Sequence, residues 1–116
     1  LKLVRRMDPF KPLPIPVPYD FDYAGIVNAY YAVPGENLGI TSVTERYFLG
    51  LCRSDQQYLA AIDQIQKNKE KILNLVESSP YLEEKPQKEM LKYLGEYFSA
   101  AENTNRFLSS IKSTCR

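Results

Sequence analysis

Apolar and polar side chains alternate with a helical period along the second half of the chain. From residue 54 onward, apolar side chains recur every three or four positions, as in a helix that buries one face. Ser54 and Gln57 have the spacing of a capping box, and Pro80 ends the pattern. We therefore predict a helix over about residues 55–77. Its apolar stripe is Tyr58, Leu59, Ile62, Ile65, Ile72, Leu73 and Val76.

A second apolar stripe predicts a helix over about residues 86–112. Pro86 suits the first turn, where a backbone N–H needs no partner within the helix. The polar stretch 102–105 leaves open a kink or a break. We expect the two long helices to form an antiparallel hairpin. The second stripe consists of Met90, Leu91, Leu94, Tyr97, Phe98, Ala101, Leu108 and Ile111.

A third, shorter helix is predicted just before these two. Ser42 and Glu45 again have capping-box spacing, which indicates a helix over about residues 42–51. With it, residues 42–116 are expected to form one compact helical subdomain.

The first 41 residues have a different character, because they contain six of the eight prolines. Residues 1–6 are typical of a short strand. Proline then occupies every second position from Pro12 to Pro18, which removes the N–H donors along one edge only, as an edge strand or a polyproline-like stretch allows. The expected fold is mainly α with a small β element, a strand pair over about residues 1–6 and 12–19.

Composition excludes several classes of function. The formal net charge is +1, which gives no electrostatic basis for binding nucleic acid or an anionic membrane. No apolar run approaches the roughly 20 residues of a membrane span. Histidine is absent and there are two cysteines, so a histidine-based catalytic triad and a structural zinc site are both excluded.

Two carboxylates follow the predicted second strand. Asp20 and Asp22 point the same way on an extended backbone, and two such groups can share a divalent cation such as Mg²⁺. The alternative is that both accept backbone N–H bonds in the turn around Gly25. Asn28, further along, is interpreted as a turn residue.

The same segment is rich in aromatic rings. Tyr19, Phe21, Tyr23, Tyr30 and Tyr31 lie in a stretch with no regular pattern, from residue 19 to residue 40. We expect so aromatic a loop to pack onto something. Covering a core and binding a sugar or a peptide both remain open.

One segment carries a resemblance to a known family. The run from Pro18 to Gly25, PYDFDYAG, is followed by Val27-Asn28-Ala29, and later by Glu45-Arg46 and Cys52-Arg53. Together these resemble an uncharacterised bacterial family with a PYDFDxxGxVNA motif. That family is in turn similar to the C-terminal part of atypical kinases of the spore-coat-protein-H and HipA types. The resemblance covers roughly residues 1–53.

The resemblance implies a role for the acidic loop. In those kinases a strand leads into an aspartate that binds the metal holding the ATP phosphates. Asp20 is then the expected metal ligand and Asp22 a second one, with Mg²⁺ and ATP as cofactors of a larger parent protein. The other kinase elements are missing here, so we expect this chain alone to hold no cofactor and to be no enzyme. The alternative is a non-catalytic structural or interaction module of an exported bacterial protein.

The start of the chain carries a further expectation. It begins with Leu1 and not with methionine, which we interpret as the mark of a C-terminal piece of a larger protein. Residues 1–41 would then be the tail of a larger lobe, and the N-terminal part of the same protein would be the partner. Without that lobe, exposed apolar surface is expected to drive self-association.

The two cysteines are expected to form a disulfide. Cys52 lies just before the predicted helix at 55–77, and the helix at 86–112 returns over a similar length, at 1.5 Å per residue. Cys115 is thereby brought back to the level of Cys52. The alternative is two unrelated free thiols. A disulfide would favour an exported parent, because cytosolic thiols stay reduced.

Overall fold

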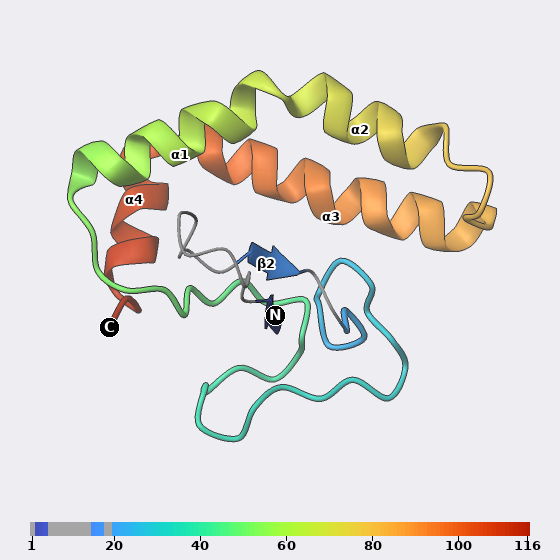
Figure 1. Cartoon of the computed structure of the whole chain (residues 1–116), viewed down its shortest axis with the longest axis horizontal. Coiled ribbons are helices and arrows are strands. Elements are labelled where there is room, and N and C mark those ends of the chain that lie inside the picture. The colour runs from blue at the N-terminus through green and yellow to red at the C-terminus, as the bar shows by residue number, and fades with distance from the viewer. Residues whose placement is uncertain (1, 5–14, 18–19) are drawn as a thin grey trace.

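A computed structural model describes residues 2–4, 15–17 and 20–116 of the chain, and the described part is mainly helical (Figure 1). Within it the helices are α1 (Asp55–Lys67), α2 (Lys69–Glu77), α3 (Glu84–Glu102) and α4 (Thr104–Lys112). Strands β1 (Lys2–Val4) and β2 (Ile15–Val17) pair antiparallel, with Leu3 opposite Pro16. The predicted strands 1–6 and 12–19 fall largely outside the described residues, so their bounds stay predictions.

The first long helix is divided at Asn68. The capping box at its start is present as predicted: the Ser54 hydroxyl accepts a hydrogen bond from the Gln57 backbone, and the Gln57 side chain accepts one from Ser54 N–H. The Asn68 side-chain amide donates to the Gln64 carbonyl at 2.8 Å. A side chain that takes up a carbonyl of the preceding turn competes with the backbone ladder. The single helix predicted over 55–77 is therefore two helices, α1 and α2.

The second long helix is divided at Asn103, within the polar stretch 102–105, where the sequence is compatible with a kink or a break. Asn103 leaves helical geometry with φ −87° and ψ 74°, and its side chain accepts a hydrogen bond from Arg106 N–H. It thus caps the start of α4. Pro86 lies in the first turn of α3, as predicted, although α3 begins at Glu84 and not at residue 86.

The helices form a bent antiparallel hairpin. In Figure 1, α1 and α2 run along one side, α3 returns beside them, and α4 turns away at the end where α1 begins. Among the residues whose burial the structure describes, the buried apolar side chains come from α1 and α3 and form the centre of the core: Tyr58, Ile62, Phe98 and Ala101.

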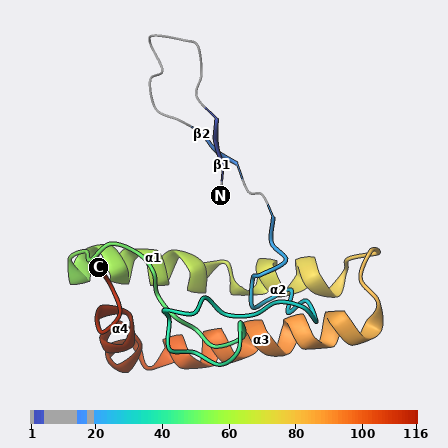
Figure 2. The ribbon, with the colours of Figure 1, turned by 90° about the horizontal axis from the view of Figure 1, so that it is seen from below.

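The helix predicted over residues 42–51 is wrong, because a turn and extended backbone occupy these positions. The Ser42 hydroxyl is bonded to Thr44, through its backbone N–H at 3.2 Å and its hydroxyl at 2.7 Å. Ser42 therefore does not cap Glu45, and the local hydrogen bonds form a turn that competes with a helix. Residues 20–53 run as one irregular segment along the helical hairpin (Figure 2).

Candidate functional site

The helices and the irregular segment line a mainly apolar cavity of about 670 Å³ that is open to solvent. All four helices contribute to its wall, and its remaining side is formed by residues 25, 43 and 45–48 of the irregular segment. Ligand pockets in proteins have volumes of about 300–1,000 Å³ and mostly apolar linings. The cavity lies within that range. Its principal apolar residues are Ile62, Ile65, Leu94, Phe98, Phe107 and Ile111.

Aromatic contacts hold residues 46–53 against the helices. The Phe48 ring meets the Tyr58 ring edge to face, with 5.8 Å between centroids. The Tyr58 hydroxyl accepts a hydrogen bond from Arg53 N–H at 3.0 Å and donates one to the Leu51 carbonyl at 3.2 Å. A buried tyrosine thus satisfies its polar end on the backbone of the irregular segment.

Arg46 is the cationic group of the cavity wall, among the lining residues that the structure describes. Its guanidinium carbon lies 4.4 Å from the centroid of the Tyr93 ring, and Nη2 donates a hydrogen bond to the Tyr93 carbonyl. Nη1 is 3.8 Å from a carboxylate oxygen of Glu96, whose side chain is about half exposed at 54%. Ion pairs so exposed contribute about 0–1 kcal/mol. The guanidinium is therefore held by stacking and by the backbone more than by a counter-ion.

The carboxylate of the neighbouring Glu45 is hydrogen-bonded within its own turn. Its carboxylate accepts hydrogen bonds from the Thr41 hydroxyl and from the backbone N–H groups of Thr41 and Ser42, at 2.8, 2.7 and 3.0 Å. These bonds lower the pKa of Glu45, the Thr41 hydroxyl contributing most. The Glu45 carboxylate is therefore hydrogen-bonded within its own turn, whereas the Arg46 side chain lines the cavity.

Tyr97 adds a hydroxyl to the same wall. Burial raises the pKa of Tyr97, and the nearby charge of Arg46 acts in the opposite direction. Its ring packs edge to face against Phe98 and Phe107. The wall is thus mainly apolar, and its polar groups are the Arg46 guanidinium, the Glu45 carboxylate and the hydroxyls of Ser110 and of four tyrosines.

Gly25 brings the acidic segment into contact with the helices. A Cβ atom at this position would lie 2.4 Å from the Val43 carbonyl oxygen and 2.8 Å from the Tyr93 hydroxyl. Only glycine fits so close an approach without displacing a neighbour.

The predicted metal ligands lie at the start of this segment, and both are exposed. Asp20 has a φ of 58°, in the left-handed region, and Asp22 accepts a hydrogen bond from the Tyr31 hydroxyl at 2.7 Å. That bond raises the pKa of Tyr31, and the charges of both aspartates act in the same direction. Among the described residues, no three His, Cys, Asp or Glu side chains are grouped closely enough to hold a metal ion.

The aromatic residues that the structure describes in this loop, from residue 21 to residue 31, are largely exposed and do not cover the core. Tyr30 is 99% exposed, and Phe21 and Tyr23 are each more than half exposed. Tyr31 packs edge to face against both Tyr23 and Tyr30. Asn28 has a φ of 48° and is a turn residue, as predicted. No helix of the described residues is long and apolar enough to cross a membrane.

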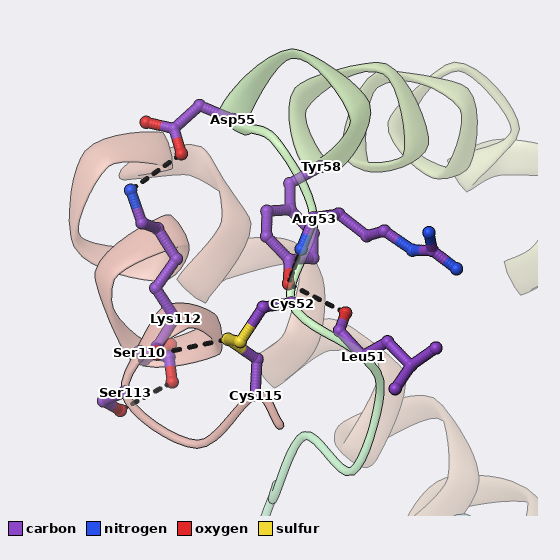
Figure 3. Close-up of a disulfide and its surroundings, with 9 residues drawn as sticks. All are labelled: Leu51, Cys52, Arg53, Asp55, Tyr58, Ser110, Lys112, Ser113 and Cys115. Carbon is purple, nitrogen blue, oxygen red and sulfur yellow. Dashed lines mark hydrogen bonds and ion pairs between the residues drawn. A yellow bond between two sulfur atoms is a disulfide. The ribbon is translucent and has the colours of Figure 1, made fainter.

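Cys52 and Cys115 form a disulfide, as predicted, with their Cα atoms 4.9 Å apart (Figure 3). Backbone hydrogen bonds flank it, from Cys52 N–H to the Arg116 carbonyl and from Arg116 N–H to the Gly50 carbonyl, both at 3.1 Å. Nearby, the Lys112 ammonium donates to the Asp55 carboxylate at 2.7 Å. These links tie the end of the chain to the residues just before α1.

The cavity itself was missed by sequence reasoning. Its helical residues were recognised as apolar stripes, but the residues that cover them were assigned to a helix over 42–51. The charged pair at positions 45 and 46, amid apolar residues, was the available signal. No protein-family model, curated protein or solved structure matches this chain.

Proposed function

We propose that this chain is a non-catalytic binding module that takes an apolar ligand into the cavity beneath residues 43–48. The carrying observation is the cavity of about 670 Å³, walled by all four helices. Protein interiors are close-packed and leave few voids larger than a water molecule. This space is open to solvent and so is not such a void, but its volume and its mainly apolar lining are those of ligand sites in proteins.

The disulfide supports this role. It links the irregular segment at Cys52 to Cys115, just after α4. The two sides of the cavity are thereby held together although the buried core is small. Disulfides persist in oxidising compartments, which supports a place outside the cytosol for the module.

The test is saturable binding of a neutral, environment-sensitive probe, N-phenyl-1-naphthylamine, to the chain with its disulfide intact. Ala61 lines the cavity and the adjacent Ala60 does not, which gives a matched pair of variants. We expect Ala61→Phe to fill part of the cavity and weaken probe binding, and Ala60→Phe to bind as the wild type does. Equal binding by the two variants, or no saturable binding by the wild type, would contradict the proposal.

A second candidate function is the metal-binding loop of a kinase-like parent, with Mg²⁺ and ATP. One observation favours it: Asp20 and Asp22 lie two residues apart at the start of the irregular segment, and both are exposed to solvent. Mg²⁺ is typically held by one or two carboxylates together with substrate phosphates. A full metal site would therefore need groups beyond this pair.

This candidate is tested by Mg²⁺-dependent ATP binding in a protein that carries the preceding kinase elements. We expect Asp20→Asn to abolish that binding and Asp63→Asn, on the exposed surface of α1, to leave it unchanged. An Asp20→Asn variant that binds Mg-ATP normally would remove the candidate. For this chain alone we expect no ATP binding by calorimetry.

A further inference from the structure

We infer that the ligand of the cavity is an amphiphile with a single carboxylate, whose charge pairs with Arg46 while its apolar body lies against the helices. This inference rests on the proposed binding function and adds the chemical class of the ligand. It follows from the position, the partners and the unused capacity of one guanidinium.

The position of Arg46 comes first. It lines an otherwise mainly apolar wall, and its side chain is 31% exposed, so most of it is withdrawn from water. The Tyr93 ring, 4.4 Å from the guanidinium carbon, and the Tyr93 carbonyl, which accepts a hydrogen bond from Nη2, hold the group in place. Stacking of this kind orients arginine without consuming its in-plane N–H donors.

The remaining capacity of Arg46 comes second. A guanidinium has five N–H donors. Among the described residues, the one hydrogen bond found for it goes to the Tyr93 carbonyl, and the Glu96 carboxylate stays 3.8 Å away from Nη1. A ligand carboxylate that reached the group would replace a weak, half-exposed ion pair with a charge-assisted hydrogen bond.

The charge of the cavity wall selects the head group. Glu45, the acidic residue of the described lining, stays ionised with one carboxylate oxygen held by three donors of its own turn, and Arg46 is the cation of the lining that can donate to a ligand head group. One guanidinium balances one carboxylate and matches its planar geometry. A phosphate, with its higher charge, would call for further cations, and the described lining contains no lysine and no second arginine.

The shape of the cavity selects the rest of the ligand. Ile62, Ile65, Leu94, Phe107 and Ile111 offer aliphatic and aromatic contact, beside the hydroxyls of Ser110 and four tyrosines. A long aliphatic chain fits this lining, because every buried CH₂ group contributes to binding without needing a polar partner.

The experiment compares dodecanoate with dodecanol, each below the concentration at which it aggregates, as displacers of N-phenyl-1-naphthylamine at neutral pH. We expect the wild type to bind dodecanoate about tenfold more tightly than dodecanol, as one charge-assisted hydrogen bond provides. Arg46→Met should abolish this preference. Arg106→Met, which removes an arginine that does not line the cavity, should retain it.

Glu96 provides an independent readout. Because its carboxylate competes for Arg46, Glu96→Gln should tighten dodecanoate binding about two- to threefold and leave dodecanol binding unchanged, the gain expected from removing a weak surface pair. If Arg46 had only a structural role, Glu96→Gln would not tighten dodecanoate binding while leaving dodecanol binding unchanged.

The outcomes distinguish the proposed apolar binding function from the inference that the ligand carries a carboxylate. Equal binding of dodecanoate and dodecanol by the wild type overturns the carboxylate inference and leaves the apolar binding function standing. A preference that survives in Arg46→Met overturns the inference as well. Failure of both compounds and of the naphthylamine overturns the binding function, and the inference with it.

Discussion

Gly25 is the residue through which the acidic segment contacts the helices. An alanine there would place a methyl carbon 2.4 Å from the Val43 carbonyl oxygen, so the backbone would have to move. Overpacking of this kind costs about 1–3 kcal/mol, and we expect Gly25→Ala to lower the free energy of unfolding by that amount. Gly95 is the matched control: it lies inside α3, and a Cβ there meets nothing within 4 Å.

Gly95→Ala should stabilise the chain by about 0.5–1 kcal/mol, because alanine loses less backbone entropy in a helix. Urea denaturation of both variants measures the two changes. A neutral effect at Gly25 would show that the segment is not docked on Tyr93 in solution.

Glu45 makes the turn at residues 41–45 sensitive to acid. Its pKa is lowered in the folded state, so the stabilisation is fully present above the ordinary carboxyl pKa of 4.5 and is lost as the pH falls through the folded-state value. We expect Glu45→Gln to be less stable than the wild type at neutral pH and the difference to shrink in acid. Denaturant midpoints at several pH values measure it, and a difference independent of pH would exclude the charge as its source.

At the scale of elements, the asparagines that end helices shape the hairpin. Asn103 separates α3 from α4 and caps the latter, so α4 turns away toward the start of α1. We expect Asn103→Ala to cost about 1 kcal/mol, the usual effect of losing an N-cap side chain. Thermal unfolding measures the loss. Asn105→Ala, an exposed position in the first turn of the same helix, is the control and should change stability by less than about 0.5 kcal/mol.

At the scale of the whole molecule, the disulfide compensates for a small core. Its cysteines are separated by 63 positions, and closing a loop of that length stabilises a fold by about 4 kcal/mol in the chain-entropy model. That is a large share of the roughly 5–15 kcal/mol that holds a domain together. We expect reductant to lower the free energy of unfolding by about this amount. The Cys52→Ser/Cys115→Ser double variant should be equally weakened and indifferent to reductant, and an unchanged denaturation midpoint on reduction would contradict the expectation.

The sequence by itself determined the helical half of this protein. The apolar stripes, the Ser54 capping box, Pro86 and the polar stretch 102–105 predicted where helices run and that they fold back on each other. The pairing of Cys52 and Cys115 followed from the similar lengths of the two predicted helices. These features are local or depend on simple geometry, so they can be predicted from the amino-acid sequence alone. The acidic loop at Asp20 and Asp22 was found as a motif, and its metal-binding role stays a prediction.

Only the tertiary structure decided between helix and extended backbone at residues 42–51, where the local sequence pattern allows both. Ser42 and Glu45 have the spacing of a helix start, yet the Ser42 hydroxyl bonds to Thr44 and the chain extends across the helices instead. The extended form brings Phe48 onto Tyr58 and Arg46 onto Tyr93, residues from distant parts of the chain. Contacts of that kind outweigh a weak local preference for helix. The cavity is lined by residues from distant parts of the chain, so a local pattern could indicate single lining residues but not the cavity itself.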